Sequence, residues 1–248
     1  MDRLLIAALI LVVLSIPTGV RALGLPKDTS SQPQALVLSS LNSMIPMGRD
    51  ASRLTSYLNQ AGYNVTFLAD GAVTVNFIVN NLDNYNLVIW RTNTYTIGHA
   101  MYWYVGEKAN SEVEQEYAAD FSASRLNADA GIIGLTPSFI TIHLTAGSLS
   151  HVKLLVFIAS FGNSIAPQFL AAGAGTVIFS VGAISLQNGL TDDLTVLLMN
   201  FLADGQNVQS AVYNTLTPYD QGQNPEDEYD TTYAPPFWYI GNGALTIT

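Results

Sequence analysis

The feature that most constrains the fold is an alternation of short apolar runs with segments of helical spacing. Strand-length apolar runs occupy residues 35–41, 64–69 and 87–91. Between them lie residues 49–62 and 75–82, in which apolar side chains recur every three or four positions. Because strands that alternate with single helices pair side by side, this pattern predicts a mostly parallel central sheet with helices on both faces, an α/β fold.

The alternation is interrupted in the middle of the chain. Residues 92–105 are rich in threonine and aromatic side chains, whereas residues 111–130 are polar and have helical spacing. We interpret this region as an inserted aromatic hairpin followed by a helix. The alternation then resumes, with strands at 153–160 and 176–184, a helix at 165–172, a helix capped by Thr191 and ending near 205, a polar excursion at 217–236 and a last strand or hairpin at 237–248.

Composition excludes several classes of function. The chain contains no cysteine, so disulfides, thiolate zinc sites and thiol nucleophiles are all excluded. Its net charge of −10 disfavours binding to a phosphate backbone, and we expect no nucleic-acid partner. Gly173, Gly175 and Gly182 do not have phosphate-loop spacing, and His143 and His151 lack the spacing of a helical zinc motif, so we expect neither a cofactor nor a metal.

The N-terminus resembles an export signal. Arg3 precedes an uncharged apolar run at residues 4–16, which falls short of the roughly 20 residues that span a bilayer. We predict a signal peptide over residues 1–22, a flexible linker over 23–34 and one domain over 35–248. The protein would then be secreted or held at the cell surface without a membrane span after cleavage, and an uncleaved anchor is the alternative.

Three stretches of the chain carry a family resemblance: residues 88–96 (VIWRTNTYT), 155–174 (LVFIASFGNSIAPQFLAAGA) and 240–246 (IGNGALT). They resemble the caspase-like fold, in the branch of gingipain-type and CHAT-type cysteine peptidases. In that family the first stretch is a strand that ends in the catalytic histidine. The second is a strand that ends in the cysteine, followed by a helix and an Ala-Gly-Ala turn. The third is similar to a closing Gly-Asp-Pro strand, with Asn242 where aspartate is usual.

The resemblance implies a Cys/His dyad at the carboxyl ends of two strands. In this chain the histidine position falls at Asn93 and the cysteine position at Ser160, or at Phe161 if the loop slips by one residue. Asparagine is no general base near neutral pH, and a serine hydroxyl without a base is too weakly acidic to attack an amide. The family mechanism therefore lacks both of its catalytic groups.

Two other readings of the same region stay open. His99 would act as a base for Ser160, with Asp70 or Asp120 as the orienting carboxylate, if the hairpin folded back over the strand ends. The aromatic group of Tyr95, Tyr102, Trp103 and Tyr104, together with His99, would form either a binding surface or ordinary hairpin packing.

The sequence thus favours a secreted or cell-surface pseudopeptidase of caspase-like fold, which binds a peptide, glycan or cell-surface protein. The first alternative is a secreted hydrolase that uses Ser160 with His99. The second is a structural protein of the cell envelope.

Overall fold

A computed structural model describes residues 32–186, 189–220 and 237–248. The predicted signal peptide, residues 23–31 of the predicted linker and residues 221–236 of the predicted excursion lie outside the described residues. Within the described part of the chain, no helix is both long and apolar enough to span a membrane.

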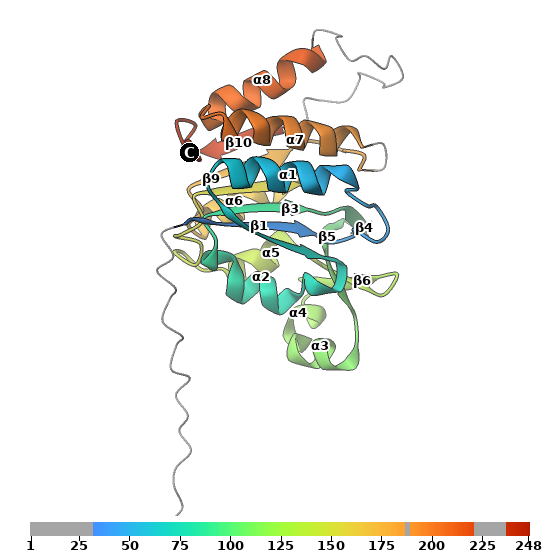
Figure 1. Cartoon of the computed structure of the whole chain (residues 1–248). Helices are drawn as coiled ribbons and strands as arrows, with labels where there is room; N and C mark the ends of the chain where they lie inside the picture. Colours follow the sequence, from blue (N-terminus) through green and yellow to red (C-terminus); the bar gives the residue numbers. More distant parts are fainter. Residues whose placement is uncertain (1–31, 187–188, 221–236) are drawn as a thin grey trace, which may run out of the picture. The chain divides into compact units, whose positions relative to one another are not determined.

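Six strands form the central sheet, in the order β10-β9-β8-β3-β1-β2 (Figure 1). Their bounds are Gln34–Ser39 for β1, Asn64–Ala69 for β2, Leu87–Arg91 for β3, Leu154–Ile158 for β8, Thr176–Ser180 for β9 and Phe237–Gly241 for β10. All neighbours pair in parallel except β10, which runs antiparallel to β9. The prediction of an α/β fold with a mostly parallel central sheet is confirmed.

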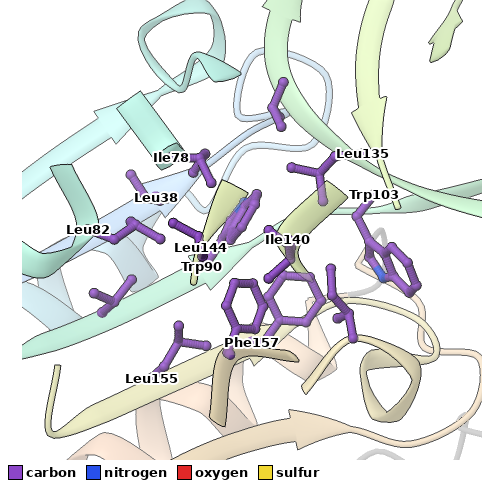
Figure 2. Close-up of a cluster of buried hydrophobic side chains, with 14 of the residues drawn as sticks. Leu38, Ile78, Leu82, Trp90, Trp103, Leu135, Ile140, Leu144, Leu155 and Phe157 are labelled. Atoms are coloured by element: carbon purple, nitrogen blue, oxygen red, sulfur yellow. The ribbon is translucent and has the colours of Figure 1, made fainter. Parts of the chain in front are cut away.

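Helices cover both faces of this sheet, because alternate residues of each buried strand point to opposite sides. One apolar cluster joins Val37, Ile89 and Val156 to helices α1 (Arg49–Gln60), α7 (Leu190–Ala203) and α8 (Val208–Asp220). The other joins the opposite face to α2 (Val75–Asn81), α5 (Pro137–His143) and α6 (Ala166–Ala171). Figure 2 shows part of the second cluster, in which Trp90 lies close to Phe157 with the rings edge to face.

A second, antiparallel sheet is built from the interrupted middle of the chain, in the order β4-β5-β7-β6. Its strands are Thr94–Ile97 (β4), Ala100–Lys108 (β5), Leu126–Asp129 (β6) and Ile132–Leu135 (β7). Two short helices, Ser111–Glu116 (α3) and Ala118–Ser122 (α4), precede β6, and three 3-10 turns lie at Asp70–Ala72 (η1), Leu82–Asn84 (η2) and Gly162–Ser164 (η3).

Two predictions for these elements are wrong. The helix expected over residues 111–130 ends at Ser122, since Ser124 adopts a positive φ of 55° and Leu126 then pairs with Leu135 as a strand. Thr191 does not cap α7, because the helix has Gly189 as its N-cap and the Thr191 hydroxyl donates to the Ser185 carbonyl instead.

Candidate functional site

The carboxyl ends of β1, β3 and β8 are where the topology predicts a site. The chain leaves β1 for β2 on one side and leaves β3 for β8 on the other, so the connections diverge between β1 and β3. Open α/β sheets bind their ligands outside the carboxyl ends at such a divergence. Three groups of polar side chains lie along this edge, at the ends of β8, β3 and β1.

At the end of β8, the Ser160 hydroxyl is engaged by the backbone. It accepts a hydrogen bond from the Ile184 amide at 3.0 Å and donates to the Ile184 carbonyl at 3.1 Å. The Ser160 carbonyl accepts from the Trp103 indole at 3.1 Å, and the residue is only 7% exposed. Ser160 therefore has a structural role that uses both its proton and a lone pair.

At the end of β3, Asn93 is also bound locally. Its side-chain oxygen accepts from the amide of the next residue, Thr94, at 2.9 Å, and its carbonyl accepts from the Tyr104 amide. Phe161, the alternative to Ser160, adopts a left-handed φ of 55° and donates its amide to Gly182. Neither Asn93 nor Phe161 supplies a nucleophile or a base.

The structure does not bring His99 to Ser160. His99 lies in the turn between β4 and β5, whereas Trp103, four residues further along β5, contacts the Ser160 carbonyl. Four residues of strand extend about 13 Å, so the hairpin carries His99 away from the serine. Asp120, one of the two predicted orienting carboxylates, binds Arg125 at 2.6 Å and His143 at 3.0 Å.

The aromatic group is largely packed within the small sheet. Tyr102 and Trp103 are buried, and Tyr95 stacks on Tyr102 with the ring centroids 5.2 Å apart. The hydroxyls of Tyr95 and Tyr104 donate to the Asn127 carbonyl and the Asp129 carboxylate, and burial raises the pKa of both phenols. Of the two readings of this group, packing accounts for Tyr102 and Trp103.

A buried ion pair lies at the end of β3, and the sequence patterns did not predict it. Arg91, the last residue of β3, donates to both carboxylate oxygens of Asp192 in the first turn of α7, at 2.6 and 2.8 Å. Its third nitrogen donates to the Ile45 carbonyl at 2.8 Å. The only signal was a cation that ends an otherwise apolar strand, LVIWR, because such a residue needs an anion when it is buried.

An open pocket of about 370 Å³ lies at the carboxyl ends of β1 and β2, where β5 of the small sheet crosses them. Gly106 permits this crossing: it has a φ of +105°, and a Cβ added there would lie 2.3 Å from the Asp70 carbonyl oxygen and 2.7 Å from that of Ser40. The pocket is lined by Ser40, Leu41, Ser43, Met44, Asp70, Gly71, Gly106, Glu107, Lys108, Asn110 and Ile132.

Two carboxylates give this pocket its charge. One oxygen of Asp70 accepts from the amide and the hydroxyl of Ser43, at 2.8 and 2.9 Å. One oxygen of Glu107 accepts from the Val75 amide at 2.9 Å, and burial raises the pKa of Glu107 despite that bond. The sequence suggests Asp70 only as an orienting residue for His99, and no sequence pattern predicts that Glu107 lies beside it.

Among the residues that the structure describes, no group of three or more histidine, aspartate or glutamate side chains is arranged to hold a metal ion. His143 and His151 lie apart, each with its own carboxylate, Asp120 and Asp83 respectively.

No protein-family model matches the chain, and no curated protein matches it.

Proposed function

We propose that this chain is a secreted or cell-surface, non-catalytic protein of caspase-like fold that binds a peptide, glycan or surface partner at the carboxyl edge of its central sheet. The parallel sheet closed by one antiparallel strand is compatible with that fold. The pocket lined by Ser40, Asp70 and Glu107 together with apolar side chains offers the partner a place to bind.

The proposal rests on the hydrogen bonds made by the side chains at the two dyad positions. The Asn93 side chain accepts from the amide of the next residue, and the Ser160 hydroxyl binds the Ile184 backbone. His99 lies in the turn at the far end of the hairpin. Acyl transfer needs a nucleophile and a base within hydrogen-bond reach of each other, with the nucleophile free to attack. This arrangement meets neither condition, so binding without covalent chemistry is the function that it supports.

A serine-reactive fluorophosphonate tests the proposal directly. We expect no labelling: neither the purified protein nor its Ser160→Ala variant should gain mass on treatment. Labelling that disappears in Ser160→Ala would overturn the non-catalytic assignment and support the hydrolase with His99. A His99→Gln variant then shows whether that histidine takes part.

A further inference from the structure

We propose that the pocket between Asp70 and Glu107 binds the cationic side chain of a lysine or arginine in a peptide. This inference rests on the proposed function, since it names the class of partner for the same edge of the sheet. It is carried by two carboxylates of the pocket lining, by a buried hydroxyl of the same lining and by the apolar residues beside them.

Within the described residues, neither carboxylate forms an ion pair with a basic side chain. In this they differ from three buried carboxylates, which are paired: Asp50 with Arg53, Asp120 with Arg125 and Asp192 with Arg91. Asp70 and Glu107 each use one oxygen on a backbone amide, and no side chain in the described part of the chain binds the other oxygen. Two half-satisfied anions in one pocket are therefore available to a cation from outside.

The second observation is a buried hydroxyl on Ser40, a residue of the pocket lining. Ser40 is 1% exposed and accepts a hydrogen bond from the Trp90 indole at 2.9 Å. Within the described residues its own proton has no acceptor, although buried hydroxyls normally donate. A ligand carbonyl that reached the Ser40 hydroxyl would accept this proton, and a peptide brings a carbonyl next to every side chain.

The remaining lining suits the stem of a long cationic side chain. Leu41, Met44 and Ile132 supply apolar surface next to the carboxylates, and Met44 is 66% exposed. Lysine and arginine lay their methylene groups on such surface while the charged end reaches an anion. A calcium ion prefers six to eight oxygen ligands, which is more than the free oxygens of Asp70 and Glu107 supply. The net charge of −10 also favours the approach of a cationic partner.

Lys108 is the one basic side chain of the pocket lining, and it forms no ion pair within the described residues. Its ammonium group would repel a cationic ligand. A Lys108→Met variant should therefore bind a lysine peptide more tightly than the parent protein, by about threefold for an exposed charge.

The test is calorimetric titration of the purified protein with four acetylated, amidated tripeptides that carry lysine, arginine, norleucine or glutamate between two alanines. We expect the lysine and arginine peptides to bind, and the norleucine and glutamate peptides to bind at least about tenfold more weakly. Asp70→Asn and Glu107→Gln should each weaken the lysine peptide by about fivefold to tenfold. Asp204→Asn, an equal change of charge at the exposed C-cap of α7, should leave it unchanged.

The inference is overturned if the lysine and arginine peptides do not bind, if norleucine binds as well as lysine, or if Asp70→Asn and Glu107→Gln have no effect while circular dichroism shows them folded. Mass spectrometry of the same mixtures separates this failure from failure of the proposed function. Cleaved peptide contradicts the non-catalytic proposal, whereas intact peptide without binding contradicts only the choice of ligand.

Discussion

The two halves of the carboxyl edge of the central sheet differ in whether their polar side chains are fully hydrogen-bonded within the protein. At the ends of β3 and β8, Arg91 is bound by Asp192 and Ser160 is bound by Ile184, so this half is closed by the protein itself. At the ends of β1 and β2, Ser40, Asp70 and Glu107 keep unused hydrogen-bonding capacity and line a pocket. In the half that holds Asn93 and Ser160 the polar groups bind one another, whereas the half that holds Ser40, Asp70 and Glu107 forms a pocket.

This difference predicts that substitutions in the two halves will affect different properties of the protein. Changes in the closed half should lower stability and spare ligand binding, whereas changes of the pocket carboxylates should weaken binding and spare stability. A protein in which both halves behaved alike would not fit this account.

The largest effect is expected from breaking the buried ion pair. Arg91→Met leaves Asp192 buried without a cation and should lower the free energy of unfolding by about 3–5 kcal/mol. Replacing both residues, with Arg91→Met and Asp192→Leu, should restore a large part of that loss because no buried charge remains unpaired. Urea unfolding measures both. Arg53→Met removes from Asp50 and Asp193 a cation whose side chain is 43% exposed, and should cost only about 1 kcal/mol.

Gly106→Ala should come next, because it acts on the junction between the two sheets. The added methyl group would overlap the carbonyls of Asp70 and Ser40, and the φ of +105° is unfavourable for alanine. We expect a loss of about 3 kcal/mol in urea unfolding, together with weaker binding of the lysine peptide. Gly98→Ala has a positive φ of 61° but open space around it, and should cost only about 1 kcal/mol without changing binding. Equal effects of the two substitutions would contradict the role given to Gly106.

A matched pair of serines tests the closure of β8. Ser160→Ala removes a hydroxyl that makes two hydrogen bonds to Ile184 and should cost about 1–2 kcal/mol. Ser180→Ala removes a buried hydroxyl that has no hydrogen-bond partner within the described residues, and should be neutral or stabilising. Thermal unfolding measures the stability of the two variants. A Ser160→Ala variant as stable as the parent protein would show that the serine is not structural.

The smallest effect concerns the pH dependence of stability at Glu107. Its carboxyl lies with Asp70 and Lys108 in the pocket and near Glu116, and burial raises its pKa above the ordinary value of 4.5. A raised carboxyl pKa favours the folded state below the unfolded pKa, and this benefit is lost as pH rises through the folded pKa. The parent protein should therefore gain stability relative to Glu107→Gln as pH is lowered from about 7 to about 5. If the melting temperatures of the parent protein and Glu107→Gln differed by a constant amount across this range, the raised pKa of Glu107 would be contradicted.

Much of the fold could be predicted from the chain because its signals are local. The runs at residues 64–69 and 87–91 form strands with these same bounds. The run at 87–91 is fully buried, as expected for a continuous apolar run in a parallel sheet, whereas 64–69 forms a half-exposed edge strand. The strand at 126–129 was missed because the sequence around it is polar and its partner, β7, supplies the pairing. Propensity alone could not reveal that dependence.

The site was less predictable, because its contacts join residues far apart in the chain. Arg91 meets Asp192, and Ser40 shares its pocket with Glu107, through folding of separate elements onto one edge. The positions of Asn93 and Ser160 at strand ends were predictable from the apolar runs before them. The partners that bind their side chains were not.

Three tryptophans allow the central claim to be tested in one experiment. The Trp90 indole donates to Ser40 in the open half, the Trp103 indole donates to Ser160 in the closed half, and Trp238 is exposed on β10. During a titration with the lysine tripeptide, followed by nitrogen–proton correlation spectra, we expect the Trp90 indole signal to shift while the other two stay in place and the peptide stays intact. A shift of the Trp103 signal without one of Trp90, or cleavage of the peptide, would contradict the division of this edge into a closed and an open half.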